Sequence, residues 1–199
     1  MKDSINIAIA GATGYIGLEL IKILSNHPKA KILYLCATKS IGKSIYHFDK
    51  RINKKNLPKI TKIEKTDWNK IDVLFTALPN GEAHKIVKTL PIKTKLIDLS
   101  ADFRLKNPNV YKKWYGNKHK STKLIPKSIY SITEFSKKKI GRYKIISCPG
   151  CYPTSIQIPL IPLIKENLIN TNNIIVDSKS GYSGAGKNIK KKFKFKYLF

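Results

Sequence analysis

The chain has 199 residues, 42% of them hydrophobic, so it is long enough to bury a core and is neither a disordered tail nor a peptide hormone. It carries 39 Lys+Arg against 12 Asp+Glu, a formal net charge of +27, which suggests a polyanionic partner such as nucleic acid. Prolines interrupt its longest apolar stretch, 145–164, and the N-terminal residues run straight into a glycine motif. We therefore expect no membrane span and no signal peptide, and a soluble, cytoplasmic protein.

The kind of basic residue offers another explanation of the charge. Only Arg51, Arg104 and Arg142 are arginines, and the lysines are scattered over the whole length among many Ile and Asn residues. An AT-rich genome would supply this composition, whereas surfaces that read bases rely on arginine forks. We favour compositional drift and expect no nucleic-acid partner.

Strand and helix patterns alternate along the chain. Short apolar runs predict strands, and apolar residues at helical spacing predict a helix over 15–26 that ends at His27-Pro28. The predicted strands are 4–10, 30–37, 72–78, 95–99, 143–148 and 173–179. This alternation predicts an α/β fold, a Rossmann-like parallel sheet with helices on both faces.

Three parts of the chain are harder to interpret. Residues 82–90 and the segment after Cys151 predict helices, but Pro159 should kink or shorten the second one. Residues 107–139 are rich in loop-forming residues, and their pattern predicts no order of elements.

A glycine motif, GATGYIG at 11–17, lies between the first predicted strand and helix. Glycine allows a tight turn and lets the backbone approach a pyrophosphate, whose charge is met by N–H groups at the helix N-terminus. The alternative is an ordinary glycine-rich turn. In this context we interpret the motif as a dinucleotide site. Its predicted cofactor-binding residues are Gly11, Thr13, Gly14, Tyr15, Ile16 and Gly17.

The residues at the end of the second predicted strand indicate which dinucleotide binds. An NAD site usually places an acid about 20 residues after the glycines, but here none occurs before Asp49. Thr38, Lys39 and Ser40, with Lys43 nearby, suit a 2′-phosphate instead. We predict NADP(H), the alternative being that Lys39 and Lys43 are ordinary surface lysines.

Cys148 and Cys151 form a C-x-x-C motif between a predicted strand and helix. A cysteine at a helix N-terminus has its thiolate stabilised, so it can act as a nucleophile. A thioredoxin-like redox pair, half a zinc site and a buried structural cysteine are the alternatives. We expect no metal, because no second cysteine pair exists and the four histidines are isolated in the sequence. With Cys36 the cysteines number three, too few for a disulfide scaffold.

Six ordered motifs carry a resemblance that covers nearly the whole chain. They are GATGYIG at 11–17, ALPNGEAH at 77–84, IDLSADFR at 97–104, WYGNKH at 114–119, CPGCYPT at 148–154 and DSKSGYSGAGK at 177–187. By them the chain resembles the N-acetyl-γ-glutamyl-phosphate reductases of arginine biosynthesis. The resemblance implies reduction of N-acetyl-γ-glutamyl phosphate by NADPH to the semialdehyde and phosphate, through a thioester on a cysteine.

The resemblance also implies roles for single residues. Cys151 matches the family's nucleophile, and Arg104 is a candidate to hold the substrate, the alternative being an ion pair with Asp102 or another acid. The loop at 180–184 resembles one near substrate and nicotinamide, the alternative being a plain flexible loop. The residues assigned to cofactor are Leu78, Pro79, Ser183 and Gly184, and those assigned to substrate are Arg104, Ser180 and Gly181.

By the same resemblance, residues 1–150 are an NADP-binding domain and 151–199 begin an α+β substrate and dimerisation domain, with homo-oligomers expected of the full-length family. The family's general acid/base histidine lies C-terminal to the SGAG loop, and none of the four histidines follows Cys151. We therefore expect an incomplete chain with little or no turnover.

The chain departs from the family pattern at two places before its end. Tyr130–Glu134 reads YSITE where the family usually has YGLPE, and Cys148 stands where the family usually has Asn. The second departure adds a thiol near Cys151 in the sequence. We hypothesise that the two can form a reversible disulfide that disables the nucleophile.

Two other functions stay open at this point. One is that of a related semialdehyde dehydrogenase, of the aspartate type or with a carrier-linked substrate. The other is a basic protein that uses a Rossmann-like domain to bind polyanions.

Overall fold

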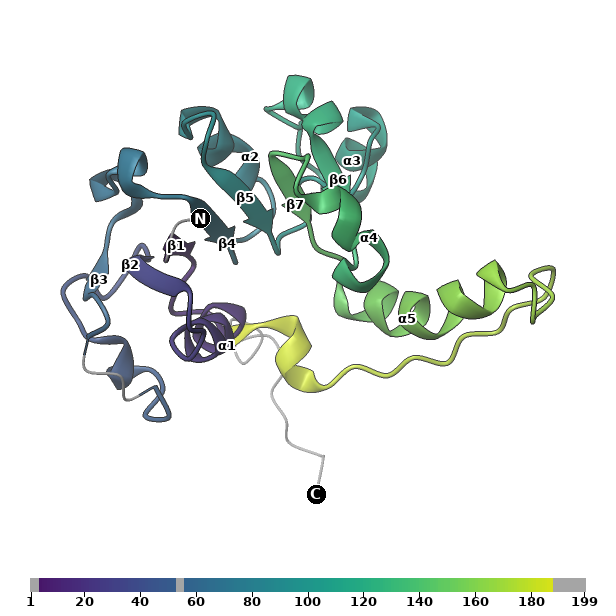
Figure 1. Ribbon diagram of the computed structural model, residues 1–199, viewed down its shortest axis with the longest axis horizontal. Helices are drawn as coiled ribbons and strands as arrows, with labels where there is room; N and C mark the ends of the chain where they lie inside the picture. The colour runs from purple at the N-terminus through teal and green to yellow at the C-terminus, as the bar shows by residue number, and fades with distance from the viewer. Residues whose placement is uncertain (1–3, 53–55, 188–199) are drawn as a thin grey trace. The chain divides into compact units, whose positions relative to one another are not determined.

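The computed structural model describes residues 4–52 and 56–187, and the chain divides into two compact units between Cys148 and Pro149. The first unit is a parallel sheet with helices packed on it (Figure 1). The second contains a long helix, α5 (Cys151–Lys165), an extended segment and a short 3₁₀ turn, η6 (Tyr182–Ala185).

The sheet of the first unit has seven strands in the order β3-β2-β1-β4-β5-β7-β6, and every neighbouring pair is parallel. After β1, the chain adds β2 and β3 on one side of β1. It then crosses over and adds β4, β5, β6 and β7 on the other side. The strands are β1 (Ile5–Ala10), β2 (Ala30–Cys36), β3 (Ile60–Thr61), β4 (Val73–Thr76), β5 (Lys95–Asp98), β6 (Ser128–Tyr130) and β7 (Ile145–Ser147).

The helices that follow these strands are mostly short. The α-helices of the first unit are α1 (Tyr15–Leu24), α2 (Ala83–Ile86), α3 (Pro108–Tyr115) and α4 (Thr133–Ile140). The 3₁₀ segments are η1 (Ile45–His47), η2 (Ile63–Lys65), η3 (Trp68–Lys70), η4 (Val87–Thr89) and η5 (Thr122–Lys127).

Two apolar clusters, one on each face of the sheet, form the core. Alternate residues of β1 supply both: Ile7 and Ile9 pack in the cluster that includes α1, and Ala8 and Ala10 in the cluster that includes Val87 of η4. A strand covered on both faces must be apolar throughout, which is why this run shows no alternation of polar residues. The predicted Rossmann-like sheet with helices on both faces is confirmed.

Most predicted elements agree with the structure to within a few residues at their ends. The predicted helix over 82–90 is divided into α2 and η4. The stretch 107–139, for which the sequence predicts no order, holds α3, η5, β6 and α4. α3 begins at the side chain of Asn107, which accepts from two N–H groups of the first turn, and it ends at Gly116, φ +73.

In the second unit, α5 runs through both Pro159 and Pro162 as one helix, so Pro159 does not end it, and a kink at Pro159 stays a prediction. The predicted strand over 173–179 is wrong, because among the described residues no strand pairs with this segment and it stays extended. Its short apolar run at 174–176 is typical of a strand, but a strand exists only where a neighbour accepts and donates its ladder hydrogen bonds. Ile175 is accordingly 89% exposed.

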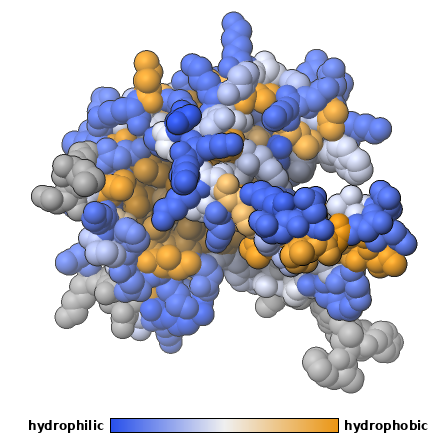
Figure 2. Space-filling view, turned by 45° about the vertical axis from the view of Figure 1, so that its right-hand side comes forward, coloured by the Kyte–Doolittle hydropathy of each residue, from blue (hydrophilic) through white to orange (hydrophobic). Residues whose placement is uncertain are grey.

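The surface agrees with the composition. Hydrophilic side chains cover most of the face shown in Figure 2, with apolar residues in separate patches between them. Within the described ranges, no helix has the length and apolarity that a membrane crossing requires.

Two glycines of the first turn allow backbone segments to touch. Gly11 has φ +84, and a Cβ added there would lie 2.2 Å from the carbonyl oxygen of Ala77. A Cβ on Gly17, in the first turn of α1, would lie 2.2 Å from the carbonyl oxygen of Gly11. Both neighbours are backbone, which cannot move away as a side-chain end can, so neither position accepts a larger residue.

We predict that Gly17→Ala lowers the free energy of unfolding by about 3 kcal/mol, because the added methyl overlaps backbone atoms. Helix propensity alone would favour alanine at this position, so the expected sign is opposite to that of propensity. Gly141→Ala is the matched control, since a Cβ there meets nothing within 4 Å. Urea denaturation measures both; equal stabilities for the two variants would contradict the tight packing.

Candidate active site

The glycine turn follows β1, the strand at which the strand order of the sheet reverses. β1 is hydrogen-bonded to β2 on one side and to β4 on the other, and the chain reaches β4 only after β3. In open parallel sheets, ligands bind in the crevice beyond the carboxyl ends of the strands at this point. The loops after β1 and β4 flank the crevice.

The predicted residues of the motif form the turn from β1 into α1. Gly14 is the N-cap residue of α1, and the N–H of Leu18 makes the first bond back to the carbonyl of Gly14, at 2.9 Å. The N–H groups of Tyr15, Ile16 and Gly17 precede that bond, and they point out of the helix N-terminus where an anion is favoured.

The loop after β4 holds the two other residues predicted at this crevice, Leu78 and Pro79. Leu78 Cδ2 would lie 3.4 Å from a Cβ on Gly11, so this loop packs directly against the glycine turn. Leu78 is half-buried and Pro79 exposed. The structure therefore brings the two predicted segments together, although they lie more than 60 residues apart in the sequence.

The residues proposed for the 2′-phosphate follow β2, the other neighbour of β1. Cys36, the last residue of β2, is paired with Ala10, so Thr38 and Lys39 emerge at the same edge of the sheet as the glycine turn. Both are exposed, and Ser40 turns the chain with φ +63.

The first acid after β2 is already paired. Asp49 Oδ2 lies 2.6 Å from Arg51 Nη2, and the same nitrogen lies 2.8 Å from Glu19 Oε1 on α1. Hydrogen bonds from Arg51 lower the pKa of Asp49 to about 2. This network ties the segment after β2 to α1.

Cys151 is the first residue of α5 and is exposed, with Gly150 as the N-cap residue in extended conformation. The helix therefore begins at the thiol, as the sequence predicts. The N–H of Thr154 makes the first bond back to the carbonyl of Gly150, at 3.0 Å. This geometry presents the exposed Cys151 side chain at the first turn of the helix.

Cys148 lies in a different environment from Cys151. Its side chain is half-buried, and burial, together with the charge of Asp98, raises the pKa of the Cys148 thiol to about 11. All three cysteines are free thiols in the structure. The hypothesis of a Cys148–Cys151 disulfide stays a prediction.

Arg104 contacts backbone carbonyls in the first unit. Its Nε donates to the carbonyl oxygen of Cys148 at 2.9 Å, and Nη2 donates to that of Leu99 at 3.4 Å. The expected alternative of an ion pair with Asp102 is wrong, because the carboxylate of Asp102 accepts from other groups. Arg104 thus holds the end of β7 against the turn after β5, and its contact with substrate stays a prediction.

Polar side chains line the carboxyl ends of three neighbouring strands. Thr76, Asp98 and Ser147 are cross-strand partners on β4, β5 and β7, and all three are fully buried. Asp98 Oδ1 accepts from Thr76 Oγ1 at 2.8 Å and from the N–H of Ser100 at 3.0 Å. Burial raises the pKa of Asp98. The Asp98 carbonyl also accepts from the N–H of Cys148 at 2.8 Å, so this row fixes where the chain leaves the sheet toward Cys151.

The loop residues assigned by resemblance lie in the second unit. Ser180 and Gly181 precede η6, and Ser183 and Gly184 lie within it. A Cβ on Gly184 would come within 2.6 Å of Ser180 Oγ, so the turn brings this hydroxyl against the glycine backbone. Ser180 and Ser183 are both exposed.

The sequence analysis missed a buried cluster in the first unit, the Asp102 cluster, made of Asp102, His84, Tyr111 and His119. The interpretation of the histidines as isolated is wrong in space, since the rings of His84 and His119 have centroids 4.9 Å apart. Burial lowers the pKa of both histidines. Three of the six motifs contain His84, Asp102 and His119, whereas Tyr111 lies outside all six, and no spacing within a motif indicates that the four residues meet.

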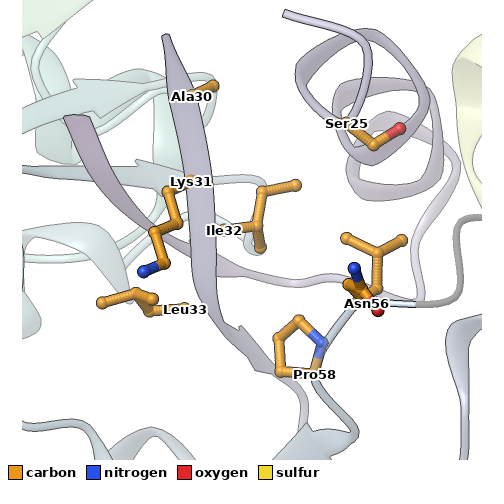
Figure 3. Close-up of a pocket in the computed structure, with 8 residues that line it drawn as sticks. Ser25, Ala30, Lys31, Ile32, Leu33, Asn56 and Pro58 are labelled. Atoms are coloured by element: carbon orange, nitrogen blue, oxygen red, sulfur yellow. The ribbon is translucent and has the colours of Figure 1, made fainter. Parts of the chain in front are cut away.

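An open pocket of about 730 Å³ lies elsewhere in the first unit (Figure 3). It is bounded by Ser25 at the end of α1, by the amino-terminal half of β2 and by residues 56–58. This is the opposite end of β2 from the segment at Thr38, so the pocket is not the crevice described above.

The sheet order and the glycine turn define a Rossmann-like α/β protein of the nicotinamide dinucleotide-binding class. Residues 6–143 match the NAD binding domain of semialdehyde dehydrogenases, and residues 151–198 match their dimerisation domain. The chain belongs to the semialdehyde dehydrogenase family.

Curated proteins named N-acetyl-γ-glutamyl-phosphate reductase are similar to this chain in sequence. An N-acetyl-γ-glutamyl-phosphate reductase of Ehrlichia canis is 46% identical over 96% of this chain and 55% of its own length. That of Rhodospirillum rubrum is 40% identical over 96% of this chain and 55% of its own length. A probable chloroplastic N-acetyl-γ-glutamyl-phosphate reductase of Arabidopsis thaliana is 41% identical over 95% of this chain and 47% of its own length. The chain spans about half the length of these relatives.

Solved structures support the fold. Aspartate semialdehyde dehydrogenase II of Vibrio cholerae, complexed with ASA, superposes with a TM-score of 0.66 at 18% identity, over 92% of this chain and 48% of that one. The Candida albicans aspartate semialdehyde dehydrogenase with NADP has a TM-score of 0.52 at 21% identity, over 82% of this chain and 47% of that one.

We predict that one thiol reacts rapidly with Ellman's reagent at pH 7.5 and that it is Cys151, because Cys36 is buried and the Cys148 thiol is half-buried with a pKa of about 11. Cys151→Ser should abolish the fast phase, and Cys148→Ser should retain it. A fast phase that survives in Cys151→Ser would contradict this assignment.

A second prediction concerns the pH dependence of stability. In the unfolded chain a histidine takes up a proton at a pKa of about 6.5. Burial lowers the pKa of His84 and His119 in the folded state, so the unfolded state binds more protons. Stability is therefore complete above about pH 6.5 and falls as the pH drops from there toward the folded values.

His119→Gln should reduce this loss, because a glutamine nitrogen can still donate to the Asp102 carbonyl but does not titrate. His47→Gln is the control, since His47 is exposed. Urea denaturation at pH 7.5, 6.5 and 5.5 measures the slope; a slope unchanged in His119→Gln would refute the role of His119.

Proposed function

We propose that the chain is the NADP-binding and nucleophile-bearing part of an N-acetyl-γ-glutamyl-phosphate reductase, which reduces the acyl phosphate to N-acetylglutamate semialdehyde and phosphate with NADPH in arginine biosynthesis. The observation that carries the proposal is an exposed cysteine, Cys151, at the first residue of the helix that follows the last strand of a dinucleotide-binding sheet. The names of the curated relatives support the substrate.

The cofactor is NADPH, bound by the glycine turn and by the loops after β2 and β4. N–H groups of the first turn of α1 would receive the pyrophosphate, and Thr38, Lys39 and Ser40 the 2′-phosphate. The pairing of Asp49 with Arg51 supports this choice, because the first acid after β2 already has a partner.

Cys151 carries the covalent step. Its thiolate attacks the acyl carbon, a C–S bond forms as the C–O bond to phosphate breaks, and phosphate leaves. When bound, the cofactor supplies the hydride that reduces the resulting thioester. The C–S bond then breaks, the aldehyde leaves and the thiolate is restored. Arg104, Ser180 and Gly181 would bind the substrate, and Ser183 and Gly184 would lie near the cofactor.

Residues 1–150 would act as the NADP-binding domain and residues 151–199 as the start of the substrate and dimerisation domain. The match to a dimerisation domain supports a homo-oligomer of the whole protein. Free cysteines, the nucleophile among them, suit the reducing conditions of the cytoplasm.

A binding experiment tests the cofactor. The chain should bind NADPH more tightly than NADH, and Lys39→Ala should weaken NADPH binding about tenfold with NADH unchanged, because a tenfold change corresponds to about 1.4 kcal/mol, a reasonable loss for one charged contact to phosphate. Lys31→Ala is the control, since Lys31 lies at the other end of β2. Fluorescence titration measures all three proteins. Equal affinity for NADPH and NADH would refute the choice of NADP.

A second experiment tests the chemistry. Mixed with N-acetyl-γ-glutamyl phosphate in the absence of NADPH, the chain should release up to one phosphate per chain and form a hydroxylamine-sensitive adduct. Cys151→Ser should form none, whereas Cys148→Ser should form it normally. Phosphate release at equal rates in the wild type and Cys151→Ser would refute the nucleophile.

A further inference from the structure

We propose that Asp102, locked by Tyr111, is a positioning residue for the dinucleotide site: it holds the loop after β4 in the conformation that forms one wall of the crevice. The inference rests on the proposed dinucleotide site and adds two residues to which neither the family match nor the resemblance assigns a role.

The loop in question is 77–81, between β4 and α2. It lies directly against the glycine turn: the N–H of Ala77 donates to the carbonyl of Ala10 at 2.8 Å, and a Cβ on Gly11 would overlap the carbonyl oxygen of Ala77. A shift of this loop would therefore move or open the contact surface beside Gly11, where the cofactor is proposed to bind.

The carboxylate of Asp102 holds the far end of the loop. Oδ1 accepts from the N–H of Gly81 at 2.7 Å, and Oδ2 accepts from the N–H of His84 at 3.1 Å. Gly81 has φ +91, so the loop reverses there through a conformation that is not stabilised by regular secondary structure. Two hydrogen bonds from backbone N–H groups, one to each oxygen of the same carboxyl group, supply the missing restraint.

Tyr111 on α3 locks the carboxylate in turn. Its hydroxyl donates to Asp102 Oδ1 at 2.7 Å, and both side chains are completely buried. The Tyr111 ring packs against His119, with centroids 5.2 Å apart, and the carbonyl of Asp102 accepts from His119 Nε2 at 2.9 Å. That nitrogen carries the proton because Nδ1 accepts from the N–H of Ser121, at 3.2 Å.

The arrangement assigns Asp102 an indirect role. The residue has no exposed surface, and its carboxylate oxygens accept from donors of the loop, of α2 and of α3. It does not touch a ligand in the crevice, so its influence on the cofactor passes through the 77–81 loop. α3, in a stretch whose elements the sequence did not predict, thus contributes to the proposed cofactor site through the contact of Tyr111 with Asp102.

Tyr111→Phe tests the proposal because it removes the hydroxyl and keeps the ring. Tyr115→Phe is the matched control: Tyr115 is the ring neighbour of Tyr111, with centroids 5.0 Å apart, and is only half-buried. We expect Tyr111→Phe to raise the Kd for NADPH about five- to thirtyfold, and Tyr115→Phe to leave it within twofold. Titrations run at least 15 °C below the lower Tm, so that loss of global stability does not contribute.

Amide hydrogen exchange separates positioning from a general structural effect. In Tyr111→Phe, exchange at Gly81 and His84 should become at least tenfold faster than in the wild type, with Ile9 and Leu96 of the sheet core unchanged. In the wild type, saturating NADPH should slow exchange at Gly81, a measurement that decides the matter even if the variant fails to fold.

An unchanged Kd in Tyr111→Phe, or no effect of NADPH on Gly81 in a wild type that binds it, would overturn the inference and leave the proposed function standing. A wild type that binds no NADPH would refute the dinucleotide site itself, and the inference with it.

Discussion

The structure depends on the contact of backbone with backbone at the carboxyl end of β1. Gly11 and Gly17 have no Cβ, and each position is so close to a carbonyl oxygen that a Cβ would overlap it. This contact sets the distance of α1 from β1 and of the loop after β4 from the glycine turn. The crevice at the reversal of the sheet order, and every proposed contact with a dinucleotide, follows from it.

Around this contact, polar groups are buried at one edge of the sheet. Asp98 fixes the position at which the chain leaves β7, and the Asp102 cluster fixes the loop that follows β4. Arg104 joins the two regions by holding the carbonyl of Cys148. These hydrogen bonds restrain the loop beside the crevice and the point at which the chain leaves the sheet toward the cysteine helix.

The sequence predicts best where a local pattern and its physical cause lie within one segment. The turn 11–17, β1, α1 and the helix that begins at Cys151 are of this kind, because glycine positions, apolar spacing and capping act over a few residues. The strand predicted over 173–179 is wrong, since its apolar pattern says nothing about a partner strand. The sequence did not predict that Arg104 donates to carbonyls that lie 5 and 44 residues away, and its contact with substrate stays a prediction.

By itself, the sequence determined the class of fold, the glycine turn between β1 and α1, the start of a helix at Cys151 and the family, because glycine placement and ordered motifs are properties of the chain alone. Only the tertiary structure decided that 107–139 forms α3, η5, β6 and α4, and that Asp102, His84, Tyr111 and His119 share one buried cluster. The physical reason is distance along the chain: such contacts form when a segment is packed, and neither propensity nor spacing encodes which remote group it will meet.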